Sequence, residues 1–124
     1  MLFREFETSS GKNVFLGKDA VSNDDLVKEF QGKTNVVMHT AEPGSPFCVF
    51  EKVRVSKKDI DEAAVACASR SQDWRDNKND VKIHLFTGKD VSKTRGMKPG
   101  SWKLLKKPKI INIDKKDIQR FLKK

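Results

Sequence analysis

Short runs of apolar residues, either alternating with polar residues or continuous, predict seven β-strands along the chain. These runs span residues 2–7, 13–16, 35–39, 47–52, 81–86, 101–105 and 109–113. Runs of this length and pattern are typical of strands that bury one or both faces. The pattern therefore predicts a chain rich in β-structure.

Three segments with helical spacing interrupt these strands, at residues 23–30, 57–72 and 115–122. Each follows a side chain that can cap a helix, Ser22, Ser56 or Asp114, and each of these has an aspartate three residues further on. This arrangement is a loose form of the capping box. The two outer helices are short, so we expect them at the periphery. The polar stretch 73–80 is predicted to be a loop.

The middle helix carries an unusually small apolar face. Its members at helical spacing are Ile60, Ala63, Ala64, Cys67, Ala68 and Ser71. Small side chains allow a helix axis to approach a sheet closely, so we expect this helix to lie across the sheet. The predicted fold class is α+β, with a mixed or mostly antiparallel sheet packed against this long helix and one or two short helices. A length of 124 residues fits one domain, which we assign to residues 1–124.

Charge is distributed unevenly along the chain. The net charge is +9, from 26 basic and 17 acidic residues. Residues 1–81 carry 12 basic and 14 acidic side chains, whereas residues 82–124 carry 14 basic and only 3 acidic ones. A basic excess confined to the last third favours contact with nucleic acid or an anionic membrane, although solvated lysine faces are also common.

Contact with a membrane is the weaker of these two possibilities. No apolar run approaches the roughly 20 residues that cross a bilayer, and the first residues lack the apolar block of a secretory signal. We therefore expect a cytoplasmic protein. Its two cysteines, Cys48 and Cys67, lie in apolar surroundings without metal-ligand spacing, which favours buried, reduced thiols.

A glycine-bearing segment at residues 87–102 joins two predicted strands. It combines three glycines with several hydroxyl groups and the cations Lys89, Lys93, Arg95 and Lys98. Glycine lets backbone amides approach an anion, hydroxyl groups donate to its oxygens, and the cations supply charge. Its composition is equally typical of an exposed connection, and both interpretations remain open.

Further lysines follow this segment at once, around a predicted hairpin centred on Lys107 and Pro108. They are Lys103, Lys106, Lys107 and Lys109. Trp102 lies beside them. An exposed tryptophan next to a basic groove can stack on an unpaired base, although a tryptophan on a strand is more often part of the core.

The second candidate segment, residues 39–46, ends a predicted strand in a histidine followed by a Pro-Gly turn. His39 is positioned either to donate to a phosphate or ribose, or to cap the strand end. The chain shows no nucleophile elbow, phosphate-binding loop, dinucleotide fingerprint or metal-ligand spacing, so we expect no enzyme activity, no cofactor and no metal.

Several of these segments, in this order, resemble the NFACT-R domain. This domain is the RNA-binding module of the ribosome quality-control NFACT proteins and also occurs in short stand-alone proteins. The resemblance covers residues 3–113. It is carried by residues 17–26, by His39 with residues 43–45, by the alanine-rich helix with Ser71, and most specifically by residues 91–93 and 96–100.

The resemblance implies an α+β RNA-binding fold that works near translation, with tRNA or rRNA as the natural ligand. The chain departs from the family at Asn35 and Val37, where an aspartate and a tryptophan are usual, and at Pro46, where a second histidine is typical. The basic segment after Gly88 keeps the family pattern better than the region around His39 does.

These observations together predict an RNA-binding protein that reads the phosphate backbone by shape, in translation, ribosome quality control or tRNA modification. The expected phosphate contacts are Lys93, Arg95, Lys98, Lys103, Lys106, Lys107 and Lys109, with Trp102 stacking. The family motifs add Lys18, His39 and Ser45. The alternative is an adapter that docks on a ribosome-associated or tRNA-modifying protein without substantial RNA affinity. A small hydrolase that uses His39 is a third, least favoured hypothesis.

Overall fold

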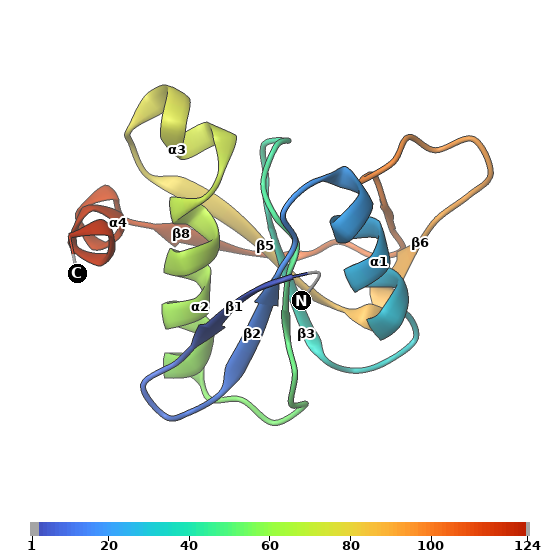
Figure 1. Ribbon diagram of the computed structural model, residues 1–124, viewed down its shortest axis with the longest axis horizontal. Coiled ribbons are helices and arrows are strands. Elements are labelled where there is room, and N and C mark those ends of the chain that lie inside the picture. Colours follow the sequence, from blue (N-terminus) through green and yellow to red (C-terminus); the bar gives the residue numbers. More distant parts are fainter. Residues whose placement is uncertain (1–2, 124) are drawn as a thin grey trace.

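The computed structural model describes residues 3–123, and within this range the chain forms a six-stranded antiparallel sheet covered on both faces (Figure 1). The strands are β1 (Arg4–Glu7), β2 (Asn13–Leu16), β3 (Val36–Thr40), β4 (Cys48–Phe50), β5 (Val81–Thr87) and β8 (Lys109–Ile113). Their order across the sheet is β1-β2-β4-β3-β5-β8. Two short strands, β6 (Val91–Ser92) and β7 (Lys103–Leu104), pair separately. The predicted α+β class with an antiparallel sheet is confirmed.

Helices lie on both sides of this sheet in Figure 1. They are α1 (Ala20–Phe30), α2 (Lys57–Ser69), α3 (Gln72–Asn77) and α4 (Lys115–Leu122), with a 3-10 turn, η1, at Gly88–Asp90. Helix α1 and the β6–β7 pair cover one face, and the other three helices lie on the opposite side (Figure 1). The longest helix of the described part has 13 residues, and no helix there is long and apolar enough to cross a membrane.

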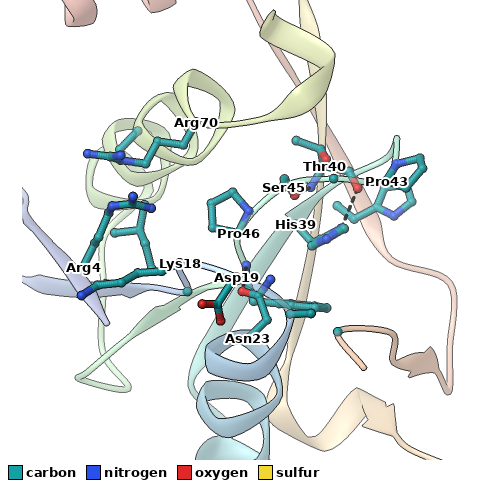
Figure 2. A pocket seen from close by; sticks show the side chains of 18 of the residues that line it. Arg4, Lys18, Asp19, Asn23, His39, Thr40, Pro43, Ser45, Pro46 and Arg70 are labelled. Carbon is teal, nitrogen blue, oxygen red and sulfur yellow. Dashed lines mark hydrogen bonds between the residues drawn. The ribbon is translucent and has the colours of Figure 1, made fainter. Parts of the chain in front are cut away.

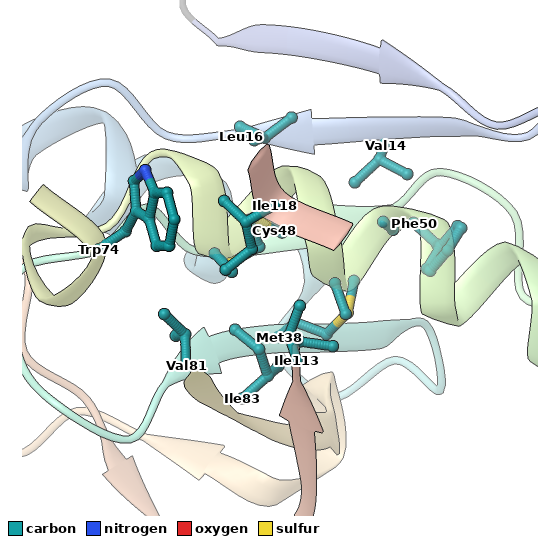
Figure 3. Close-up of a cluster of buried hydrophobic side chains, with 14 residues drawn as sticks. Val14, Leu16, Met38, Cys48, Phe50, Trp74, Val81, Ile83, Ile113 and Ile118 are labelled. Atoms are coloured by element: carbon teal, nitrogen blue, oxygen red, sulfur yellow. The ribbon is translucent and has the colours of Figure 1, made fainter. Parts of the chain in front are cut away.

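The predicted small-residue helix packs across the sheet as expected. Ala63, Ala64, Cys67 and Ala68 of α2 are fully buried in the larger hydrophobic cluster, against the strand residues that Figure 3 shows around it. Because these side chains add little bulk, the helix lies close enough for Met38 to be fully buried beneath it. This face contains most of the core.

Helix α1 is not peripheral, and that expectation is wrong. Its residues Leu26, Val27 and Phe30 form a second buried cluster with strand residues of the opposite face, among them Val37 and Phe86. Three apolar residues at helical spacing are enough because the strands are apolar on both faces. The sheet is therefore covered on both sides at its centre.

The helix starts follow capping chemistry, with one shift. Ser56 and Asp59 form the predicted capping box of α2. Helix α1 begins earlier than predicted, since Asp19 is its N-cap and the Ser22 hydroxyl accepts from the Asp19 backbone amide as the third helical residue. Asp114 caps α4 as predicted, accepting from the Lys116 amide.

The segment 73–80 is partly helical, contrary to the prediction of a loop. The predicted helix 57–72 ends at Ser69, and Ser71 then acts as N-cap for α3, accepting from the Trp74 amide at 3.1 Å. Trp74 is buried in the larger core cluster. A six-residue helix held by one buried side chain has no periodic pattern to detect in the sequence.

The predicted hairpin around Lys107 and Pro108 does not form. Strand β7 pairs with β6, and β8 pairs with β5 over five residue pairs. Ile111 and Ile113 of β8 extend the apolar face beneath α2, whereas Leu104 of β7 packs in the cluster on the α1 side. The two strands thus bury their side chains in different cores, and the chain between them crosses from one layer to the other.

Most other strand limits agree with the prediction to within two residues. Strands β2 and β8 match it fully, β4 ends at Phe50, and β6 was not predicted. Residue 2 of the first predicted strand lies outside the described residues.

Candidate nucleic-acid interface

A groove of about 1020 Å³ lies at the ends of β2 and β3, bordered by residues of α1, of α2 and of the segment 99–102. Its walls come from β1, the turn between β2 and α1, the loop after β3, the end of α2 and residues 99–102 (Figure 2). Among the candidate residues, Lys18, His39, Ser45 and Trp102 line it. The groove therefore gathers the motif residues that lie far apart in the sequence.

The motif at residues 17–26 builds one wall of this groove. A Cβ atom at Gly17 would collide with the Asn23 side-chain oxygen, which accepts a hydrogen bond from the Phe47 amide at 2.9 Å. The Gly17 amide in turn donates to the Phe47 carbonyl at 3.0 Å. Glycine is required here because the backbone approaches the asparagine so closely. The motif thus fixes the start of α1 to Phe47, the residue directly before β4.

Asp24, within the same motif, holds the basic loop in place. One of its carboxylate oxygens accepts from Lys93 Nζ at 2.6 Å, from the Gly100 amide at 2.9 Å and from Trp102 Nε1 at 3.0 Å. The Lys93 ammonium also lies 5.3 Å from the centre of the Trp102 ring. Loop 93–102 is therefore folded onto α1, and the family motif Val91–Lys93 and Gly96–Gly100 has a structural explanation.

This arrangement changes the ionisation of Asp24. Burial alone would raise its pKa, but the hydrogen bonds from Lys93, Gly100 and Trp102 outweigh burial and hold the pKa below its usual value. The Lys93 charge is balanced by this carboxylate. The Trp102 ring is half-buried against the α1-side cluster, and its indole N–H is occupied, so it serves as an anchor of the loop.

The remaining candidate cations lie outside the groove, along loop 93–102 and on the segment that runs from β7 through the connection to the start of β8. Their side chains are exposed: Arg95, Lys98, Lys103, Lys106, Lys107 and Lys109. Lys106 Nζ lies 3.7 Å from Asp90, but its side chain is 70% exposed and this pair is weak. The basic last third is thus a solvent-facing surface beside the groove, here called the lysine surface and defined by these six residues.

His39 is held by its surroundings as a neutral ring. It stacks on Phe47 with ring centres 4.4 Å apart, and its Nδ1 lies 2.8 Å from the Thr40 carbonyl oxygen. Burial lowers its pKa, and nearby His84 lowers it further, while the hydrogen bond with Thr40 opposes this fall. The Ser45 hydroxyl accepts from the Thr40 amide at 3.1 Å. Both side chains therefore shape the groove floor, and His39 brings no positive charge to it at pH 7.

Sequence analysis missed three arginines that line the same groove. The Arg75 guanidinium donates to the Arg70 carbonyl and to the Gln72 side chain. Arg4 of β1 and Arg70, the C-cap of α2, lie beside Lys18 at one end of it (Figure 2). Both belong to the part of the chain with a net negative charge, so counting charge by segment cannot detect them. They come together only through strand pairing, which places Arg4 opposite Leu16, two residues before Lys18.

No group of three or more His, Cys, Asp or Glu side chains suited to a metal ion occurs among residues 3–123. The fold and the groove define a small α+β domain with a binding groove and a basic surface beside it. Residues 2–106 match the sequence profile of the NFACT protein RNA binding domain. The chain belongs to this family, as its motifs indicated.

Two known proteins are similar to this chain. The archaeal Rqc2 homolog aRqcH of Methanocaldococcus jannaschii is 28% identical over 87 residues, which are 68% of this chain and 13% of that protein. The structure of the C-terminal part of the fibronectin/fibrinogen-binding protein from Streptococcus suis superposes with a TM-score of 0.82 at 19% identity. That match covers 97% of this chain and 49% of the other, and it shows that the fold is shared.

Proposed function

We propose that this chain binds RNA, tRNA or rRNA, through its phosphate backbone and works in ribosome quality control or a related step of translation. The observation that carries the proposal is the family match over residues 2–106, whose description is of RNA binding rather than of catalysis. The similarity to an Rqc2 homolog supports the ribosomal setting. A cytoplasmic site of action is part of this proposal.

The lysine surface supplies the phosphate contacts in this proposal. Its six cations are exposed, and five of them form no ion pair with a described residue. When exposed cations without partners neutralise phosphates, the counterions condensed on the RNA are released, which gives affinity without base specificity. Lys93 and Trp102 act indirectly, by holding the loop against Asp24 so that Arg95 and Lys98 project from a fixed backbone.

A titration of tRNA at several salt concentrations tests this proposal. If the six cations of the lysine surface each neutralise one phosphate, the log-log slope of affinity against salt is about −5 for duplex regions and about −4 for single strands. Replacing Lys103, Lys106, Lys107 and Lys109 by Gln should reduce the slope by about 3. A control variant with Lys52, Arg54, Lys57 and Lys58 replaced by Gln removes the same charge from the β4–α2 connection and the first turn of α2. Equal effects of both variants would count against the lysine surface.

A protein-interaction adapter is the second candidate. Leu105 and Ile110 are 57% and 54% exposed, and they flank the lysines at residues 106–109. Exposed apolar side chains within a basic patch are suited to docking on an acidic protein with an apolar centre. Under this alternative the protein shows no salt-dependent affinity for tRNA, and Leu105→Ser with Ile110→Ser abolishes capture of the partner.

A further inference from the structure

One end of the groove gathers three cations that come from separate parts of the chain. Arg4 lies on β1, Lys18 in the turn before α1, and Arg70 at the end of α2 (Figure 2). All three are exposed. We call them the arginine cluster. It is distinct from the lysine surface, since none of the lysine-surface residues lines the groove.

The charge of this cluster is only partly balanced within the protein. Neither Arg4 nor Arg70 forms an ion pair with a residue in the described range. Asp19, the N-cap of α1, lies next to Lys18 and offsets part of its charge, so the unbalanced charge of the cluster is that of Arg4 and Arg70. Like charges held together without enough acidic partners repel one another, and a bound anion relieves that repulsion. Guanidinium groups are suited to the oxygens of a phosphate.

The surface next to the cluster is apolar. Phe6 and Phe121 pack edge to face with ring centres 5.6 Å apart, and both line the groove. Leu122 beside them is 52% exposed. Apolar and aromatic surface beside a cationic site is the combination on which proteins bind unpaired nucleotides, because the phosphate and the base need different surroundings.

The volume of the groove, about 1020 Å³, is sufficient for a short length of unpaired RNA. The groove continues from the arginine cluster past His39 to Trp102 and the edge of loop 93–102. A strand lying in it would therefore pass from the arginine cluster to the lysine surface.

We infer that an unpaired RNA strand crosses this groove, with one of its phosphates bound by Arg4, Lys18 and Arg70. The inference rests on the proposed function, because it assumes that the ligand is RNA. It adds that the RNA must present an unpaired segment, and that the net-negative part of the chain supplies part of the binding site. Duplex RNA contacts the lysine surface alone.

Fluorescence anisotropy with labelled RNA tests this inference. The probes are a 12-nucleotide oligouridylate and a 12-base-pair RNA duplex, each titrated between 0.05 and 0.5 M salt. The proteins are the wild type, the double variant Arg4→Gln with Arg70→Gln, and a control, Lys52→Gln with Arg54→Gln, which removes two exposed cations away from the groove. Thermal unfolding checks that all three are equally folded.

The double variant should lose the single phosphate contact that the arginine cluster makes. Its salt slope for oligouridylate then falls by about 0.7. If the variant and the wild type bind equally in 1 M salt, the variant then binds about fivefold more weakly at 0.1 M. Duplex binding by the same variant, and oligouridylate binding by the control, should change by less than about threefold.

The outcomes separate this inference from the function on which it rests. If the wild type binds neither probe at 0.05 M salt, the proposed function fails and the inference fails with it. If the wild type binds and the double variant matches the control, the inference is wrong while the function stands. Equal losses for duplex and single strand would overturn the assignment of the groove to an unpaired strand.

Discussion

Asp24 is the residue whose replacement most sharply tests how the basic loop is held. Asp24→Ala removes the acceptor of three hydrogen bonds, from Lys93 Nζ, the Gly100 amide and Trp102 Nε1. Its side chain is 26% exposed, so water can partly replace each bond. At about 1 kcal/mol for each bond, the loop loses about 3 kcal/mol of stability relative to its detached state.

Hydrogen exchange at the Gly100 amide measures this loss directly. About 3 kcal/mol corresponds to roughly a 100-fold faster exchange, since each 1.4 kcal/mol is a factor of ten. The control is Asp25→Ala, which removes an exposed neighbouring carboxylate that forms no hydrogen bond or ion pair with a described residue. Unchanged protection of Gly100 in Asp24→Ala, or the same change in both variants, would refute the role assigned to Asp24.

The same anchor has a defined pH dependence. Because the pKa of Asp24 is lowered in the folded protein, the stability it contributes is fully present above its ordinary pKa of about 4. This stability is lost as the pH falls through the lower folded value. Protection of Gly100 should therefore stay constant from pH 7 to 5 and decrease below pH 4. A decrease centred near pH 6 would contradict this explanation.

Three further predictions concern the core and the groove. Gly88→Ala places a methyl group against the Phe30 carbonyl oxygen and 2.8 Å from that of Lys33, so denaturant unfolding should show a loss of about 1–3 kcal/mol or more. His39 is shielded from protonation, so its NMR titration midpoint should lie below 6.5, and a midpoint above 7 would contradict the neutral ring. Cys48 is fully buried and its pKa is raised by burial, so it should resist a thiol reagent at pH 8 until denaturant is added; rapid labelling of the folded protein would be inconsistent with this burial.

The sequence predicted those parts of the fold that depend on local periodicity. The alanine face of α2 and the short apolar runs of β2 and β8 are visible in short windows of the sequence, and the structure confirms these elements. Strand pairing was harder to predict, because β7 and β8 are close in sequence and this favoured a hairpin between them. In the structure each strand pairs with the strand that borders the hydrophobic cluster in which its own side chains are buried. Helix α3 was missed because one buried side chain, Trp74, gives no period.

In the candidate interface, too, the residues visible in one segment of the sequence were predicted, and those brought together by tertiary structure were not. Exposed lysines in one segment are apparent from a charge count, and most of them are solvent-facing in the structure. The partner of Lys93 is 69 residues away, so neither its neutralisation nor the anchoring of Trp102 is visible locally. Arg4 and Arg70 reach the groove through tertiary packing alone. Whether the candidate residues bind RNA stays a prediction.

Ultraviolet crosslinking of the purified protein to tRNA, followed by mass spectrometry of the attached peptides, tests the central claim most directly. The account predicts crosslinks within residues 93–109 and next to the groove around Lys18 and Arg4, and these should diminish as salt is raised. The absence of crosslinks at low salt, or their concentration on residues 51–58, would contradict it.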